Sequence, residues 1–368
     1  MRTYPIPMVP GPVKLPQTVL DAYQANYGSA DMESEFLELY NKTEADLKLI
    51  LGTKNQVVIQ SGEGMLALWG ALKSCLLPGD RVLSIATGVF GDGIGDMASS
   101  IGAEVIKIRR PYNETISDMS EIEEAIVAFK PKMITVVHCE TPSGTLNPIK
   151  QLGQIKKRYQ VPLLYVDAVA SVGGTPVLSD AWHIDLCLGG SQKCLSSLPD
   201  MSFLSVSNIA WEIINQVKYV GYDALQPFQH AQKKHYFPYT PSWHGVAGLY
   251  AGAGLILKGG LDNSYDRHES VASYCRKKLI EMGFSLFPAH HAIPSPTVTA
   301  VNMPETFTWS EFDTRLRQHG LVVGGSYGPL AGKVFRLGHM GTQADRNLVE
   351  LALNTLSRTS QELNLGLC

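Results

Sequence analysis

Hydrophobic runs rich in β-branched residues alternate with amphipathic stretches over the first half of the chain. The runs are predicted to form short strands at residues 56–60, 81–85, 104–108, 132–137, 162–166, 185–188 and 202–206. The stretches between them have the spacing of helices, at residues 65–75, 92–101, 118–129 and 149–159. Strands that alternate with helices of this length indicate a parallel sheet covered on both faces.

The rest of the chain has a different pattern. An apolar stretch with several glycines at 245–257 predicts a closely packed helix. Amphipathic helices are expected at 269–282, 309–319 and 345–363, with short strands near 297–301 and 334–337. We therefore expect a smaller α+β domain that begins near residue 260.

Composition narrows the class of protein. The chain has 368 residues, of which 45% are hydrophobic and 18% are charged, so it can bury a substantial core. Its net charge of −3 gives no basic excess for nucleic acid or a membrane surface. Six cysteines are scattered without a C-x-x-C pair, which argues against a disulfide framework or a metal site. We expect a soluble protein of the reducing cytoplasm.

Three groups that could take part in catalysis or ligand binding follow predicted strands. Asp167 comes directly after a buried strand, where a carboxylate is costly unless it meets a cation. Lys193 follows the next strand, and a lysine withdrawn from water becomes usable as an amine nucleophile. A glycine-rich turn at 60–65 opens a helix, whose free N–H groups suit an anion. Ligands gather at this end of parallel strands.

An acid, a lysine and an anion turn are together the parts of a pyridoxal phosphate site. The lysine would form the Schiff base, the carboxylate would protonate the pyridine nitrogen, and the turn would take the phosphate. Phe90 could supply a ring to stack on the pyridine. Each residue alone has a structural explanation, as a cap, a solvated lysine or a core side chain. Their joint order along one series of strands favours the functional interpretation.

Other chemistries fit less well. The glycines at 91–95 resemble a dinucleotide loop, but the third glycine of that motif would fall at Asp96. The G-x-S-x-G elbow of hydrolases is absent from the sequence. His290 and His291 are adjacent and would point apart in a strand, so we interpret them as loop or interface residues.

These residues lie in motifs that resemble one family, the class V, fold-type I pyridoxal phosphate aminotransferases of the alanine–glyoxylate/serine–pyruvate group. The motifs are V-P-G-P at 9–12, H-C-E-T-P-S-G-T-L-N-P at 138–148, V-D-A at 166–168, S-Q-K-C at 191–194, Y-T-P at 239–241 and K-V-F-R-L-G-H-M-G at 333–341. The resemblance covers nearly the whole chain. It implies an α/β fold with a large, mostly parallel seven-stranded sheet and a smaller C-terminal α+β domain. The expected division is an N-terminal active-site segment at 1–15, a cofactor-binding domain at 16–259 and a small domain at 260–368.

The resemblance also implies roles for particular residues. Lys193 would be the Schiff-base lysine and proton shuttle, and Asp167 would bind the pyridinium nitrogen. Further cofactor contacts are expected from Glu63, Gly64, Met65, Phe90, Thr141, Gln192 and, from a second subunit, Thr240. Substrate contacts are expected from Gly11, Tyr327 and Arg336, whose planar fork suits a carboxylate. A homodimer with shared active sites is implied.

The implied reaction moves an amino group from a small amino acid, of the alanine or serine type, to glyoxylate or pyruvate. Two positions differ from the commoner pattern, and a third differs from one branch of the family. Glu63 stands where relatives often have serine, and Phe237 where some place a phosphate-binding tyrosine; both resemble a pyridoxamine–pyruvate aminotransferase branch, which uses the unphosphorylated vitamin as substrate. That branch carries an arginine at the position of Tyr327.

Several alternatives stay open. The carboxylate of Glu63 either occupies the anion site itself or points away and leaves the backbone to hold a phosphate. A lyase or decarboxylase on the same fold is a further possibility, because fold does not fix function. A non-catalytic, cofactor-binding regulator is the alternative from another class of protein.

Overall fold

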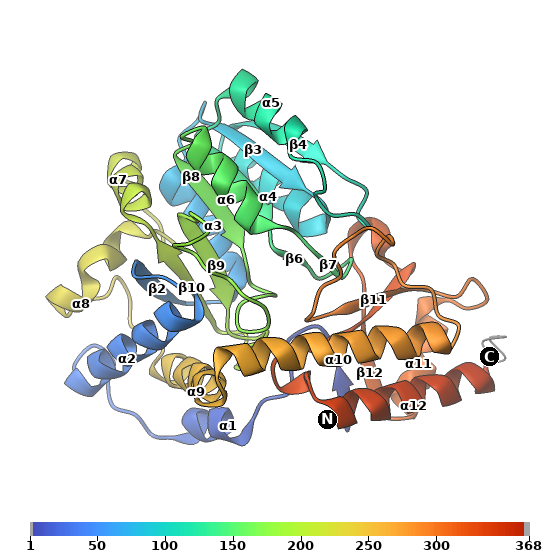
Figure 1. Ribbon diagram of the computed structural model, residues 1–368. Coiled ribbons are helices and arrows are strands. Elements are labelled where there is room, and N and C mark those ends of the chain that lie inside the picture. Colours follow the sequence, from blue (N-terminus) through green and yellow to red (C-terminus); the bar gives the residue numbers. More distant parts are fainter. Residues whose placement is uncertain (1–2, 364–368) are drawn as a thin grey trace.

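The computed structural model describes residues 3–363 and contains a seven-stranded sheet and a separate four-stranded sheet (Figure 1). The larger sheet has the order β2 (Gln56–Ser61), β10 (Met201–Val206), β9 (Leu186–Gly190), β8 (Leu163–Asp167), β5 (Met133–Val137), β3 (Arg81–Ala86) and β4 (Glu104–Arg109). Strands β5, β8, β9 and β10 are buried along their whole length, as expected for a sheet covered on both faces. The predicted large, mostly parallel sheet is confirmed.

Strand β10 is the exception to the parallel arrangement. It runs antiparallel to both of its neighbours, β2 and β9. The connection from β9 to β10, residues 191–200, is shorter than the dozen or more residues that a parallel crossover needs. The same short connection carries Lys193 away from the end of β9.

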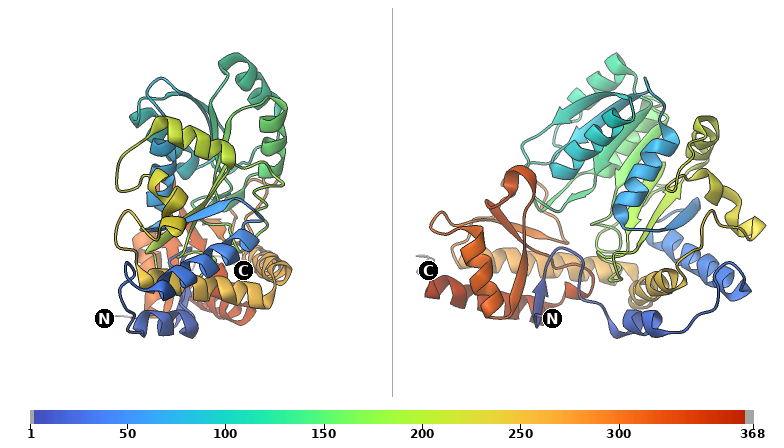
Figure 2. Two further views of the ribbon diagram at one scale, coloured as in Figure 1. Left: turned by 90° about the vertical axis from the view of Figure 1, so that its left-hand side faces the viewer. Right: turned by 180° about the vertical axis from the view of Figure 1, so that it is seen from behind.

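Helices cover both faces of the large sheet. Helices α3 (Gly64–Cys75), α4 (Val89–Ser100) and α7 (Asn208–Val217) lie on one face, and α5 (Ser120–Phe129) and α6 (Ile149–Arg158) lie on the other (Figures 1 and 2). Helices α1 (Gln17–Gln24) and α2 (Ser34–Ile50) pack on α9 (Trp243–Gly259). The short helix α8 (Ala231–Lys234) precedes α9 along the chain. A two-stranded hairpin, β6 (Cys139–Glu140) and β7 (Thr145–Leu146), follows β5.

The smaller sheet has its own core and its own helices. Its order is β1 (Ile6–Met8), β12 (Leu321–Gly325), β13 (Val334–Leu337) and β11 (Thr299–Asn302). Helices α10 (Leu261–Glu281), α11 (Trp309–Gln318) and α12 (Arg346–Glu362) pack against this sheet and each other. The N-terminal segment therefore contributes an edge strand to the small sheet, and the domain boundaries at 15 and 259 stay a prediction.

Two long helices, α9 and α10, follow one another where the chain passes from the large sheet to the small one. Helix α10 begins eight residues before the predicted 269, directly after Gly260, whose φ of +86° separates it from α9. Within residues 3–363, none of the helices is long and apolar enough to cross a membrane. The cytoplasmic location stays a prediction.

Candidate active site

A pocket lies at the carboxyl ends of the central strands of the large sheet. The expected site residues that line it are Glu63, Gly64, Met65, Phe90, Thr141, Asp167 and Lys193. They come from the N-termini of α3 and α4, the hairpin after β5, the end of β8 and the connection after β9. Cys139, Val169 and Ala170 complete much of the remaining wall. The strand-end residues that the sequence pattern assigns to one site thus share one cavity.

The Lys193 amine is held by the N-terminal segment. Its Nζ donates a hydrogen bond to the Pro10 carbonyl. Burial, and next the nearby positive charge of Arg336, lower the pKa of Lys193. A lysine with reduced proton affinity has a larger fraction of neutral amine, which is the nucleophilic form.

Gly11 lies directly against this lysine. Its φ of +85° favours glycine, and a Cβ added there would lie 2.5 Å from the Lys193 Cδ. The Val13 N–H donates to the Gln192 carbonyl at 3.2 Å, which fastens the segment on its other side. The structure therefore places Gly11 beside the lysine, where a larger residue would displace the amine.

Asp167 is the last residue of β8 and is 6% exposed. Burial raises the pKa of Asp167 to about 6, although the Val169 N–H and the charge of Lys193 act in the opposite direction. Its Oδ1 accepts from the Val169 N–H at 2.9 Å. A buried carboxylate of this kind stabilises a cation placed next to it, such as a protonated ring nitrogen.

Arg336 in β13 is a buried cation without an anion. It is 2% exposed, and no ion pair is made by this side chain within the described part of the chain. Its Nε donates to the Gly325 carbonyl at 2.7 Å, and Nη2 donates to the same oxygen. The Tyr327 ring centroid lies 4.7 Å from its guanidinium carbon. The arrangement suits a carboxylate brought in by a substrate.

The N-terminus of α3 already holds a carboxylate. Glu63 is the N-cap residue, and its Oε2 accepts from the Met65 N–H at 2.9 Å. Its other oxygen accepts from the Gln192 side chain. Glu63 therefore points onto the helix end instead of away from it. Gln192 was expected to contact a phosphate directly, but its side chain contacts Glu63.

Five of the expected site residues do not line the pocket of their own chain, namely Gly11, Gln192, Thr240, Tyr327 and Arg336. Thr240 is exposed, and its Oγ1 donates to Asp31 Oδ2 at 2.9 Å. It is not among the residues that line the pocket. This position agrees with the expectation that Thr240 acts in a second subunit, and a single chain does not test it.

The sequence analysis missed two groups at the site. Glu140 is fully buried behind Phe90, and the Pro10 carbonyl holds Lys193. Both lie inside motifs at 9–12 and 138–148, but local patterns do not show which distant atoms these groups contact.

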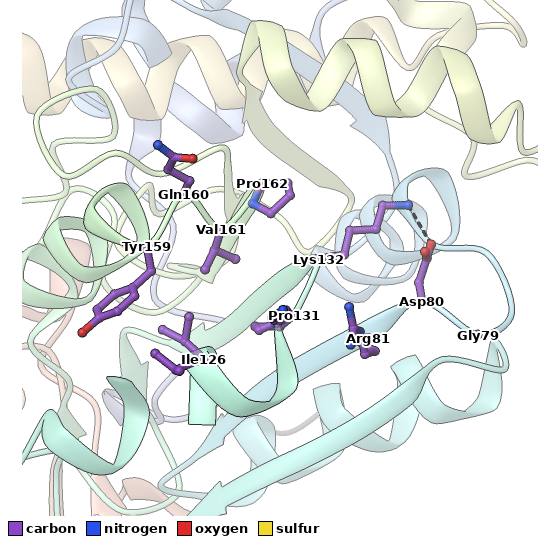
Figure 3. A pocket seen from close by; sticks show the side chains of 12 residues that line it. Gly79, Asp80, Arg81, Ile126, Pro131, Lys132, Tyr159, Gln160, Val161 and Pro162 are labelled. Atoms are coloured by element: carbon purple, nitrogen blue, oxygen red, sulfur yellow. Dashed lines mark hydrogen bonds and ion pairs between the residues drawn. The ribbon is translucent and has the colours of Figure 1, made fainter. Parts of the chain in front are cut away.

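A larger groove lies at the opposite end of the sheet and holds none of the expected residues. It has a volume of about 700 Å³ and lies beside the starts of β3, β5 and β8 (Figure 3). Its Lys132 is paired with Asp80 at 2.6 Å. Because ligands of such sheets bind at the carboxyl ends, this groove is not the candidate active site.

Comparison with known proteins gives the class. Residues 9–334 match the family described as Aminotransferase class-V. The chain belongs to this family, and it is an aminotransferase with the fold-type I architecture.

Particular relatives fall within the same group. The chain is 36% identical to an uncharacterized aminotransferase of Methanocaldococcus jannaschii, over 95% of the chain and 92% of the relative. It is 31% identical to the alanine–glyoxylate aminotransferase of Oryctolagus cuniculus, over 96% and 91%. The crystal structure of pyridoxamine–pyruvate aminotransferase from Mesorhizobium loti superposes with a TM-score of 0.94 at 29% identity, covering 99% of this chain and 93% of that one.

Proposed function

We propose that the chain is a pyridoxal phosphate-dependent aminotransferase that moves an amino group from a small amino acid, of the alanine or serine type, to glyoxylate or pyruvate. The observation that carries the proposal is that Lys193 and Asp167 line one small pocket, while the buried cation of Arg336 lies near enough to Lys193 to lower its pKa. The similarity to alanine–glyoxylate aminotransferases supports the substrate class.

The donor set of the pocket fits the cofactor. Lys193 offers an amine of lowered pKa, Asp167 offers a buried carboxylate, and Phe90 and Thr141 line the space between them. Lys193 would hold the cofactor covalently, Asp167 would face its ring nitrogen, and Phe90 would cover one face of the ring. When bound, the cofactor supplies an electron-accepting ring and carries the amino group.

Lys193, Arg336 and the Pro10 carbonyl have separate roles in the proposed reaction. The Lys193 Nζ removes the α-proton of the substrate as a general base and returns a proton as a general acid. Arg336 binds the substrate carboxylate and so fixes the α-carbon relative to Lys193. The Pro10 carbonyl orients the amine during the part of the cycle in which it is free.

We also propose that the enzyme is a homodimer with shared sites, to which the partner subunit contributes Thr240. Two large side chains that lie beside the pocket are exposed, Met65 at 40% and Tyr222 at 60%. An open hollow beside Glu63 is lined by Leu66, Tyr222 and other residues of this surface. Exposed apolar side chains that gather beside a site, rimmed by charged residues such as Lys73 and Asp223, are typical of a subunit interface.

A second candidate function is pyridoxamine–pyruvate transamination with an unphosphorylated vitamer as substrate. The observation that favours it is Glu63, which occupies the N-terminus of α3. A phosphate at that position would meet a carboxylate, and like charges ~4 Å apart at an effective dielectric near 20 repel by about 4 kcal/mol. The similarity to the Mesorhizobium loti enzyme agrees with this candidate.

Mass spectrometry of the purified protein after borohydride reduction tests both candidates. An adduct of phosphorylated pyridoxyl mass on Lys193 supports the first, and an adduct without phosphate supports the second. Amino donors are then compared by their formation of 2-oxo acids with glyoxylate or pyruvate as acceptor. A colourless protein that takes up neither vitamer and consumes no amino acid would support a regulator. Release of ammonia or carbon dioxide in place of amino transfer would indicate a lyase or decarboxylase.

A further inference from the structure

Helix α4, which carries Phe90, begins without a capping side chain of its own. Its N-cap residue is Gly88, which has no side chain to accept from the first turn. The first N–H groups of a helix lack partners within the helix and need an acceptor from elsewhere. In most helices a serine, threonine, asparagine or aspartate at the N-cap supplies that acceptor.

Glu140 supplies the acceptors from a distant part of the chain. One carboxylate oxygen accepts from the Gly91 N–H at 2.7 Å, and the other accepts from the Phe90 N–H at 3.2 Å. Glu140 lies in β6, about fifty positions further along the sequence, and is 0% exposed. Its backbone is fixed as well, because its carbonyl accepts from the Gly144 N–H at 2.8 Å.

The glycines of α4 leave room for this side chain. A Cβ at Gly88 would lie 2.4 Å from the Glu140 Cδ. A Cβ at Gly91 would lie 2.9 Å from the Ile85 carbonyl oxygen and 3.2 Å from a Glu140 oxygen. A side chain at Gly88 would thus displace the carboxylate.

No cation balances this carboxylate. Within residues 3–363 Glu140 makes no ion pair, and the carboxylates of Asp167 and Asp92 lie near enough to disfavour its charge. Burial raises the pKa of Glu140 to about 8, and the Gly91 and Phe90 N–H groups oppose that shift. A buried carboxyl group without a cation partner costs stability, whether it is charged or, as its raised pKa favours near neutral pH, protonated. A cap residue at position 88 would satisfy the helix at a lower cost. The placement of Glu140 therefore needs a reason other than stability.

We propose that Glu140 is a positioning residue, which fixes the first turn of α4 so that the Phe90 ring stays against the bound cofactor. Glu140 directly precedes Thr141, and both Phe90 and Thr141 line the pocket. One side chain thus ties together two walls that come from separate segments. The inference rests on the proposed function, because it concerns a cofactor between these walls.

The experiment uses the full-length protein and a double-mutant cycle. Glu140→Met removes both acceptor oxygens at similar volume, and Glu140→Gln keeps one. In the cofactor-free protein, amide hydrogen exchange at Phe90 and Gly91 should rise by about ten-fold in the Met variant and less in the Gln variant, the upper end of the scale of a lost hydrogen bond between neutral groups. Unchanged exchange at both amides overturns the proposal.

Vitamer binding provides the second readout. The dissociation constant of pyridoxal phosphate or of pyridoxal, whichever the wild type binds more tightly, should rise about ten-fold in Glu140→Met. In a Phe90→Leu background the same substitution should have little further effect, because Glu140 acts through Phe90. Equal effects in both backgrounds overturn the proposal. If the Met variant does not fold, the Gln variant carries the same cycle.

Glu44→Met is the matched control. Glu44 is also a buried glutamate that accepts from a backbone N–H, that of Val57 at 3.0 Å, but it does not line the pocket. It should leave exchange at Phe90 and Gly91 and the affinity for the vitamer unchanged. A wild-type protein that binds neither vitamer overturns the proposed function, and with it this role, whatever the exchange rates show.

Discussion

The amine of Lys193 lies between a backbone carbonyl and the field of a buried guanidinium, and this environment sets its proton affinity. We expect Lys193→Ala to abolish multiple turnover, because no other amine lines the pocket among the described residues to hold the cofactor and move the α-proton. Steady-state rates measured beside circular dichroism would check this. Near-normal rates in a folded variant would remove Lys193 from its assigned role.

The raised pKa of Asp167 affects the pH dependence of the free energy of unfolding as well as the rate. Its pKa is raised to about 6 in the folded protein, above the value of about 3.9 expected in an unfolded chain. The folded, cofactor-free protein therefore keeps a proton that the unfolded chain releases. The stability from this group is complete below pH ~4 and is lost as the pH rises through ~6. At about 1.36 kcal/mol per pKa unit, the change is ~3 kcal/mol.

Asp167→Asn should remove that part of the pH dependence. The free energy of unfolding of the cofactor-free variant, relative to wild type, should rise by about 2–3 kcal/mol between pH 4 and pH 7. Urea unfolding at several pH values up to 7 would measure it, a range in which Glu140, with its pKa of about 8, stays mostly protonated. Parallel curves would show that Asp167 titrates normally. The variant should also lose most of its activity, because an amide does not stabilise a protonated ring nitrogen.

Single residues differ in how far the sequence reveals them. Asp167 and Lys193 could be predicted because each directly follows a recognisable strand, and parallel strands bring their ends together. The role of Glu140 could not be predicted, because its partners Phe90 and Gly91 are about fifty residues away in the sequence. Only the folded chain shows that it caps α4.

The helices and strands also differ in how far the sequence predicts them. Strands β5, β8 and β9 were predicted because each begins with a short run of apolar residues, β-branched in β5, at the spacing of a strand–helix alternation. The direction of β10 was not, since periodicity gives no direction and the short connection decides it. Strand β1 was missed because it has only three residues and pairs with β12, more than 300 positions away. The start of α10 was missed because its first turns are mostly polar.

The N-terminus of α3 is the element on which the choice of vitamer depends. Glu63 caps this helix and takes the donors that a phosphate would use. We expect Glu63→Ser to shift the ratio of dissociation constants toward pyridoxal phosphate, relative to pyridoxal, by about ten-fold or more, because repulsion is removed while serine still caps the helix. Titration of the cofactor-free protein with both vitamers measures this ratio.

The matched control is Asp345→Ser, which exchanges another acidic N-cap, that of α12, for serine. Asp345 accepts from the Leu348 N–H at 2.8 Å and does not line the pocket. The ratio should not change in this variant. If it is also unchanged in Glu63→Ser, Glu63 does not control the phosphate position, and the pyridoxamine–pyruvate candidate loses its structural support.

At the scale of the whole molecule, the site is assembled from every part of the chain. Lys193 and Asp167 belong to the large sheet, Arg336 belongs to the small one, and Pro10 lies on the segment that joins the small sheet to the large domain. Thr240 is the exception, since it is hydrogen-bonded to Asp31 on the surface of its own chain. The homodimer that we propose would account for that position, because twofold symmetry lets each subunit complete the site of the other.

Complementation between two impaired variants tests this arrangement. We expect Thr240→Ala to lower activity and Lys193→Ala to abolish it. In a hybrid dimer of the two, one site combines the intact Lys193 of one chain with the intact Thr240 of the other. After unfolding and refolding of an equimolar mixture, about half of the dimers are hybrids with one complete site of two, so about a quarter of wild-type activity should return. If both residues acted within one chain, the hybrids would contain no complete site, and mixing would restore nothing beyond the average of the two variants. Size-exclusion chromatography of each variant shows whether the dimer itself has formed.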